Sequence, residues 1–247
     1  MRLAICLVLL LAGGGELAAE PAAGSYHYRI RHALFGDIGA HEVTVRHEGD
    51  RVVVEHRAHL MVELLGVTAH ERRSQYREVW QGDRLVAFDG LTVDNRERFE
   101  VMARAQGDHL VIEGAAGRSL APAATVPSQP SLALATLRSR FFDIKTGEVL
   151  DATVRPAGPE WLKLGDQPVA TDKYEITGEL EQIVWYDASG LFVQWRLWRQ
   201  GAAITLTRER QAPRRRTAPA LARRLPRPQC LADRRRSRRP DRGCWRP

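Results

Sequence analysis

Cysteine is scarce in this sequence. Its three cysteines are Cys6, Cys230 and Cys244, so the long stretch between the first two contains none. Over that stretch the protein can form neither a disulfide nor a thiolate metal site. The stability of the folded part must therefore come from a hydrophobic core, which a chain of 247 residues is long enough to build.

Long hydrophobic runs are also missing. The longest, Leu3–Ala12, is about half the length of roughly 20 residues that a membrane-spanning helix needs. It follows Arg2 and precedes small residues, which is the pattern of an export signal with cleavage after Ala19 or Ala23. We therefore expect a signal peptide over residues 1–19, no transmembrane segment, and a periplasmic or secreted protein.

The motifs that mark common enzyme sites do not occur. There is no Gly-x-Ser-x-Gly elbow, and no glycine-rich phosphate loop opens a helix. Glu78, Asp94 and Asp187 could act as acid–base groups, but carboxylates of this kind are mostly solvent-exposed in proteins. We assign no catalytic residue and no cofactor, and a hydrolase is the least favoured interpretation.

A metal site has little support either. All eight histidines lie in the first half of the chain, and His41 and His70 are each followed by glutamate, as in a zinc-protease helix. The second histidine of that motif would fall at Val45 or Ser74, and both neighbourhoods have the pattern of strands. We predict no metal site and expect scattered surface and groove histidines, with a site assembled across strands as the alternative.

Positive charge is concentrated at one end of the chain. Residues 212–247 hold 13 of the 37 basic residues and two of the 30 acidic ones, which leaves 24 basic and 28 acidic residues in 1–211. A uniformly basic, nucleic-acid-binding surface is therefore excluded for the folded part, which we expect to be one β domain over 20–211. The Arg- and Pro-rich end is expected to be disordered. It is either an arm for an anionic partner or the product of a shifted reading frame.

Alternation with a period of two dominates the middle of the sequence. Over Val52–Leu64 every second residue is apolar except His56, and charged residues lie between them, which is typical of a half-buried strand. Turns of the form Glu/Gln-Gly-Asp at 48–50, 81–83 and 106–108 indicate antiparallel neighbours. The predicted fold class is all-β: one large curled antiparallel sheet or partly closed barrel.

Three regions depart from this alternation. Apolar residues at helical spacing predict one short helix over 131–142, packed on or across the sheet. Residues 114–130 and 156–165 show little periodicity and contain prolines, so we expect surface loops there.

Apolar and aromatic side chains on the expected inner face of the sheet suggest a groove for an acyl chain or a similar ligand. The residues expected to line this groove are Val54, Leu60, Val62, Tyr76, Trp80, Trp185 and Trp195. The alternative is that the inward-facing aromatic side chains simply fill the core.

Four short pieces of the chain occur in a characteristic order: Gly36–His41, Glu78–Trp80 with Leu85, Thr92–Asn95, and Trp185–Gly190. They resemble an uncharacterised family of exported Gram-negative bacterial proteins, a domain of unknown function. That family usually has glycine after the Asp-Asn pair, where this chain has Arg96. The resemblance implies a sheet similar to that of periplasmic lipoprotein carriers, and it implies no catalytic residue.

Three functions stay open at this point. The first is a periplasmic β-protein that binds a lipid or another apolar or amphipathic molecule on the concave face of its sheet. The second is a structural or interaction protein of the cell envelope with a filled core. The third is an enzyme, which would need titratable groups that converge in a cleft. A continuous apolar cavity would favour the first function over the second.

Overall fold

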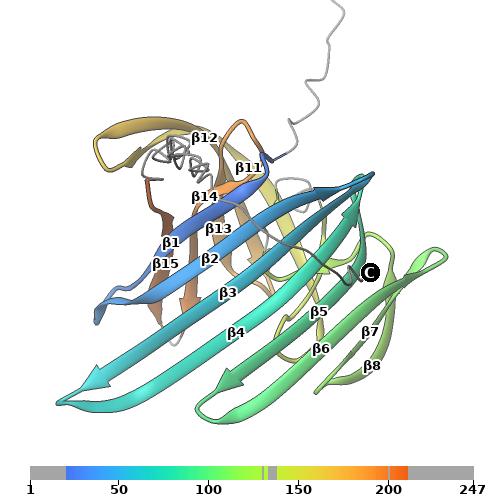
Figure 1. The fold of residues 1–247 in the computed structure, drawn as a ribbon, viewed down its shortest axis with the longest axis horizontal. Coiled ribbons are helices and arrows are strands. Elements are labelled where there is room, and N and C mark those ends of the chain that lie inside the picture. The colour runs from blue at the N-terminus through green and yellow to red at the C-terminus, as the bar shows by residue number, and fades with distance from the viewer. Residues whose placement is uncertain (1–20, 130, 133–137, 200, 211–247) are drawn as a thin grey trace, which may run out of the picture. The chain divides into compact units, whose positions relative to one another are not determined.

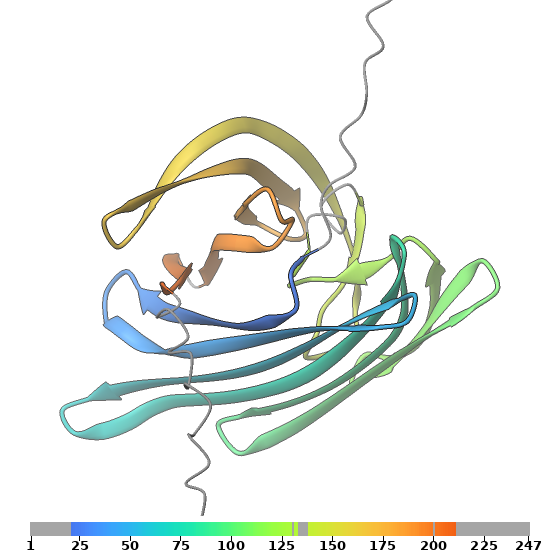
Figure 2. The same cartoon turned by 45° about the horizontal axis from the view of Figure 1, so that its top comes forward.

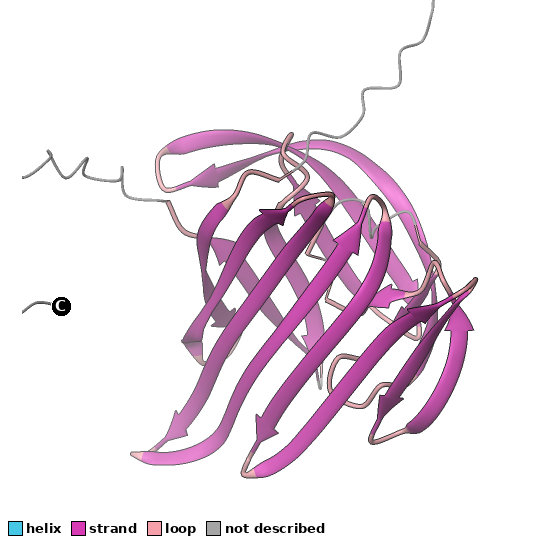
Figure 3. Cartoon of the chain, turned by 45° about the vertical axis from the view of Figure 1, so that its right-hand side comes forward, coloured by secondary structure: helices cyan, strands magenta, loops and turns pink. Residues whose placement is uncertain are grey.

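The computed structural model describes residues 21–129, 131–132, 138–199 and 201–210, all within one compact unit. These residues form fifteen β-strands joined by turns and loops, without an α-helix (Figure 3). In chain order the strands are β1 Gly24–His32, β2 Gly36–Glu48, β3 Arg51–Leu64, β4 Val67–Gln81, β5 Arg84–Asp94, β6 Glu97–Gln106, β7 His109–Gly114, β8 Gly117–Pro122, β9 Val126–Pro127, β10 Arg140–Phe142, β11 Val149–Leu164, β12 Gln167–Gly178, β13 Gln182–Tyr186, β14 Phe192–Arg199 and β15 Ala202–Arg208.

All fifteen strands belong to one sheet. Its order runs from β8 back to β1, then from β15 back to β9, so the first and last described strands are neighbours (Figure 1). We call β1–β8 the N-terminal arm and β9–β15 the C-terminal arm. Neighbouring strands are antiparallel except β9 and β10, and the sheet curls without closing, because β8 and β9 remain its edges. The prediction of one large curled antiparallel sheet is therefore confirmed.

The curl brings the two arms face to face. In Figure 2 the long hairpin of β11 and β12 arches above, while β1 to β6 extend below. Successive strands in a sheet twist in one direction, so a sheet with this many strands curls round instead of staying flat. The inner faces of both arms then share one core.

The long strand β3 follows its sequence pattern. Val54 and His56 are fully buried on the inner face, while Glu55 and Arg57, which alternate with them along the strand, are more exposed. The turn at Gly49 has a positive φ of 66°, which glycine adopts without strain. Alternation and turn chemistry together therefore set the register of this hairpin.

Aromatic pairs fill the core between the two arms. The ring of Tyr28 on β1 stacks on Phe192 of β14 with ring centroids 4.2 Å apart, and its hydroxyl donates to the Phe192 carbonyl at 2.8 Å. Phe88 on β5 meets Phe142 on β10 edge-on at 5.0 Å. Both pairs connect the N-terminal arm to the C-terminal arm, so the core holds the curl in place.

The helix expected over 131–142 is not found in the part of it that the structure describes. Residues 133–137 lie outside the described residues, and Leu132 forms an isolated bridge with Leu191. Arg140–Phe142 form β10 and pair with β9 and β11. At Arg140–Phe142 strand pairing has therefore overridden the predicted helix.

Both regions expected as loops contain strands. Residues 114–130 include β8 and β9, and residues 156–165 belong almost entirely to β11. The expected signal peptide over 1–19 and the Arg-rich end over 212–247 lie outside the described residues.

A close approach of two strands explains one glycine of the first sequence piece. A Cβ at Gly39 on β2 would lie 2.1 Å from the carbonyl oxygen of His59 and 2.7 Å from Cα of Leu60, both on β3. Backbone atoms cannot move aside as a flexible side chain can. Only glycine therefore fits at this position without separating the two strands.

We predict that Gly39→Ala lowers the free energy of unfolding by about 2 kcal/mol or more, because β2 and β3 must move apart. Urea denaturation measures the change. Ala40→Ser, on the next and exposed position of the same strand, is the control and should stay within about 0.5 kcal/mol of the wild type. A Gly39→Ala variant as stable as this control would contradict the close approach.

Candidate functional site: a cavity inside the curled sheet

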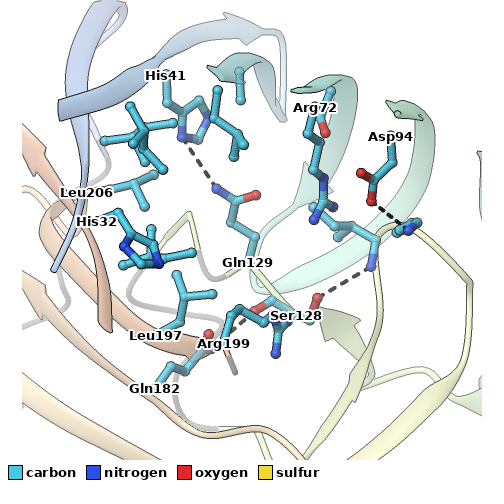
Figure 4. Close-up of a pocket in the computed structure, with 18 of the residues that line it drawn as sticks. His32, His41, Arg72, Asp94, Ser128, Gln129, Gln182, Leu197, Arg199 and Leu206 are labelled. Carbon is cyan, nitrogen blue, oxygen red and sulfur yellow. Dashed lines mark hydrogen bonds and ion pairs between the residues drawn. The ribbon is translucent and has the colours of Figure 1, made fainter. Parts of the chain in front are cut away.

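The concave side of the sheet contains a cavity of about 860 Å³ (Figure 4). Its walls come from both arms: β1 to β5 on one side, and β13 to β15, the β12–β13 turn and the start of β11 with the turn before it on the other. This volume lies within the range of small-molecule binding sites, roughly 300–1,000 Å³. The core packing of the two arms therefore leaves a space large enough for a ligand.

Most of the wall is apolar. On β3 every second residue faces the cavity, and on β14 and β15 apolar side chains meet them from the other arm. The apolar residues of these three strands are Ala58, Leu60, Val62, Leu64, Trp195, Leu197, Ile204 and Leu206. Such a surface favours hydrocarbon over water.

One stripe of the wall is polar. His70, Arg72 and Ser74 alternate along β4, so all three face the cavity. Asp94 of β5 is the cross-strand partner of Arg72. Its carboxylate accepts a hydrogen bond from Nζ of Lys145 at 2.7 Å, and its other oxygen lies 3.5 Å from Nε2 of His70. The cavity is therefore amphipathic, with hydrocarbon on β3 and hydrogen-bond donors on the neighbouring strand.

Exposed apolar side chains lie at one end of the cavity. The β1–β2 turn exposes Leu34 and Phe35, and the tip of the β3–β4 hairpin exposes Leu64, Leu65 and Val67. Phe35 and Leu64 also line the cavity, so its apolar lining continues to the surface at these turns. Large apolar side chains grouped in this way often mark binding surfaces.

A chain of buried polar groups lies beside the cavity. Nε2 of His41 is 3.0 Å from Nδ1 of His56, and Nε2 of His56 is 3.0 Å from the hydroxyl of Ser131. That hydroxyl donates to Oε1 of Glu78 at 3.0 Å, and the indole N–H of Trp80 donates to the other carboxylate oxygen at 2.8 Å. All five side chains are buried, so the chain satisfies groups that water does not reach.

The hydrogen bonds of this chain point in one direction. Gln129 donates its amide N–H to Nδ1 of His41 at 3.4 Å, which leaves the proton of His41 on Nε2, facing His56. His56 then accepts on Nδ1 and donates from Nε2 toward Ser131. Every donor is thus oriented toward the carboxylate of Glu78, and chains aligned in this way polarise one another favourably. His41 and Gln129 line the cavity, so the chain connects the cavity to a buried carboxyl group.

Burial shifts the pKa values of these groups away from the charged forms. It raises the pKa of Glu78 to about 7, although the hydrogen bonds from Trp80 and Ser131 oppose the shift. It lowers the pKa of His41 to about 3. Burial, together with the neighbouring His41, also lowers the pKa of His56 well below its ordinary value. Near neutral pH both imidazoles are therefore neutral, while Glu78 is close to its titration midpoint.

Ser131, His56 and Glu78 are the residue types of a hydrolase triad, but their arrangement differs from one. The Ser131 hydroxyl is only 1% exposed and is not part of the cavity lining of the described chain. His56 uses the same nitrogen, Nε2, toward both Ser131 and Glu78, at 3.0 and 3.5 Å. A triad needs the acid on the other ring nitrogen and a nucleophile that a substrate can reach. This chain of hydrogen bonds instead anchors the segment around Gln129 to the sheet.

The seven residues expected to line a groove fall into three groups. Those that line the cavity are Leu60, Val62 and Trp195. Those that belong to the packed core and are not part of the lining are Val54, Tyr76 and Trp80. The one outside both is Trp185, on the opposite face of β13, where its indole donates to Glu160 at 3.0 Å. The structure therefore brings three of the seven to the cavity.

Sequence reasoning missed the polar residues of the cavity, above all Arg72, His41 and Gln129. A signal was present for one of them, because Arg72 occupies the same strand face as Tyr76. His41 and His56, which were expected only as scattered surface or groove histidines, contact each other in the core. The strand face on which a residue lies does not reveal such contacts, because they also depend on the register between neighbouring strands.

Two further features concern only the described part of the chain. No three side chains of His, Cys, Asp or Glu in it gather closely enough to hold a metal ion. It also contains no helix that could cross a membrane.

The raised pKa of Glu78 predicts a pH-dependent stability. Because the folded-state pKa of about 7 exceeds the ordinary 4.5, the contribution of Glu78 is fully present below about pH 4.5 and is lost as the pH rises through 7. The wild type should therefore lose stability relative to Glu78→Gln between about pH 5 and pH 8, by roughly 3 kcal/mol at most. Urea denaturation at several pH values measures the difference.

The control is Glu63→Gln, a change of an exposed carboxyl group on β3, which should leave the pH profile of the wild type unaltered. The lowered pKa values of His41 and His56 act in the opposite direction, so the difference between wild type and variant is the informative quantity. A difference between wild type and Glu78→Gln that does not change with pH would contradict the assignment.

Solved structures with a similar fold come from proteins of low sequence identity. A "beta-barrel-like protein of domain of unknown function DUF1849" from Brucella abortus has a TM-score of 0.57 and 9% identity, over 77% of this chain and 97% of that one. At this identity the likeness concerns the fold alone. Lipoprotein LppX of Mycobacterium tuberculosis has a TM-score of 0.24 and 17% identity, over 76% and 85% of the two chains. That score is too low to support an argument about its ligand.

A search of curated protein sequences found no match. A family model described as a domain of unknown function, DUF6134, matches residues 36–209, which include all four of the sequence pieces. The expectation of such a family is confirmed, and the chain belongs to the DUF6134 family.

Proposed function

We propose that this protein is an exported, periplasmic binding protein that holds an apolar or amphipathic molecule in the cavity of its curled sheet. The observation that carries the proposal is the cavity of about 860 Å³ with an apolar wall contributed by both arms. A sheet with a purely structural function is expected to fill this space with its own side chains, because protein interiors are close-packed. The cavity therefore supports a ligand-binding function over an interaction protein with a filled core.

The exposed apolar turns support the same proposal. Phe35 and Leu64 connect the lining of the cavity to the surface, so a hydrophobic ligand could enter without crossing a polar barrier. Export itself is supported by the pattern of residues 1–19, which lie outside the described residues. An enzymatic function has less support, because Ser131 and Glu78 are sealed in the core.

Uptake of a fluorescent fatty acid by the purified protein tests the proposal. The wild type should bind the probe with saturation, and Ala58→Phe should weaken binding by at least about tenfold, equivalent to about 1.4 kcal/mol. Ala58 lines the cavity from β3, so a phenyl ring there occupies the volume that the ligand needs.

The matched control is Ala40→Phe. Ala40 lies one strand away on β2, is exposed, and is not part of the cavity lining, so this variant adds the same ring on the outer face. It should bind the probe as the wild type does. Equal loss of binding in both variants, or no saturable uptake by the folded wild type, would overturn the proposed function.

A further inference from the structure

We propose that the ligand carries an anionic group, a carboxylate or a phosphate ester, and that the guanidinium of Arg72 binds it. This inference rests on the proposed function and assigns the chemical class of the ligand. It starts from Arg72, a partly buried cation of the cavity lining. The other cations of the lining are Lys145, which pairs with Asp94, and Arg199, which is exposed.

The position of Arg72 aims its side chain into the cavity. It lies on β4 between Leu60 of β3 and Asp94 of β5, its partners in register, and it is partly buried. Figure 4 shows it extending into the cavity between Gln129 and Asp94. A cation in this place faces hydrocarbon on one side and open space in front of it.

Arg72 has no counter-ion within the described residues. Asp94, its nearest acidic neighbour in the sheet, already has one oxygen 2.7 Å from Nζ of Lys145 and the other 3.5 Å from Nε2 of His70. No ion pair or hydrogen bond connects Arg72 to any residue of the described ranges. Its five N–H donors are therefore available to a ligand.

The other acidic residues of the lining do not neutralise Arg72 either. Asp143 accepts the backbone N–H groups of Lys145 and Thr146, both at 2.8 Å, within its own turn. Glu179 accepts the backbone N–H of Asp151 at 2.7 Å. Glu148 is exposed to solvent. These carboxylates are occupied or hydrated, whereas Arg72 is neither paired nor fully solvated.

The chemistry of the guanidinium selects the kind of anion. Its planar fork forms two parallel hydrogen bonds to a carboxylate or a phosphate, which an ammonium group cannot do. The hydroxyl of Ser74, two residues further along the same strand face, lies in the same wall and is hydrogen-bonded to the hydroxyl of Thr92 at 3.1 Å, so the guanidinium is the main donor here. A cationic headgroup at the same place would instead meet the like charge of Arg72.

The apolar side chains of β3, the strand next to β4, indicate that the rest of the ligand is hydrocarbon. Leu60 pairs with Arg72 across the β3–β4 ladder, and the apolar row of β3 continues from it to Leu64 at the exposed end. A molecule with its anionic end at Arg72 can therefore lay a hydrocarbon chain along β3. The class that fits both walls is a single-chain anionic amphiphile.

The test compares ligands that share one tail and differ in their heads. Dodecanoate, dodecyl phosphate, dodecanol and dodecyltrimethylammonium, each below its micelle concentration, compete with the fluorescent fatty acid for the full-length protein. We expect the two anions to bind more tightly than the alcohol and the cation. Arg72→Met should weaken binding of both anions by about 10- to 100-fold and leave binding of the alcohol nearly unchanged.

The matched control is Arg73→Met. Arg73 is the next residue of the same strand, faces the outside, and pairs with Glu71 at 2.7 Å, so this variant removes the same charge from the other face. It should bind all four ligands as the wild type does. Arg72→Lys, which keeps the charge but loses the fork, should recover part of the affinity for the anions. Melting curves confirm that each variant is folded.

The outcomes separate the inference from the proposed function. If the wild type binds all four ligands with equal affinity, the anion site is wrong and the binding function stands. The same holds if Arg72→Met loses as much affinity for dodecanol as for dodecanoate. Failure of the folded wild type to bind any of the four overturns both. Competition by inorganic phosphate alone, without a tail, would identify an anion site that does not need a lipid and would overturn the amphiphile class.

Discussion

The cavity depends on the pairing of β1 with β15. These two strands join the N-terminal arm to the C-terminal arm through five residue pairs, from Tyr28 opposite Arg208 to His32 opposite Ile204. Without this ladder the arms would be two separate sheets, each with an exposed inner face and one further open edge, β1 or β15. The stacked pair of Tyr28 and Phe192 reinforces the junction from inside. The two arms therefore enclose the cavity only because β1 pairs with β15.

Alternation and turn residues correctly predicted one curled antiparallel sheet, but they did not show which irregular segments add strands to it or which distant residues meet. Alternation over Val52–Leu64 correctly predicted β3, and the glycine turns at 48–50, 81–83 and 106–108 correctly predicted the β2–β3, β4–β5 and β6–β7 hairpins. Residues 156–165 looked like a loop because of Pro156 and Pro159, yet they lie in β11. Beyond Asp151 this strand pairs only with β12, so it is an edge there, and an edge tolerates proline. Which strand lies at an edge follows from the topology of the whole sheet.

In the candidate site, too, the strand face of a residue was predictable and its contacts with distant residues were not. Leu60 and Val62 reach the cavity because their strand face was predictable from alternation. Glu78, which was expected to be solvent-exposed, is fully buried, and the signal that was overlooked is that it shares a strand face with Tyr76 and Trp80. The hydrogen bond from Ser131 to Glu78 was not predictable, because the two residues lie 53 positions apart in the sequence. Side-chain direction is local information, whereas register and loop placement depend on the tertiary fold.

The central claim is that the curled sheet encloses space that a ligand occupies. Native mass spectrometry of the protein, gently extracted from the cells that produce it, tests this most directly. The expected result is a population heavier than the polypeptide alone, which releases a small amphipathic molecule on collisional activation and disappears in Ala58→Phe. A single species at the mass of the chain alone, which also takes up no added amphiphile, would contradict the account.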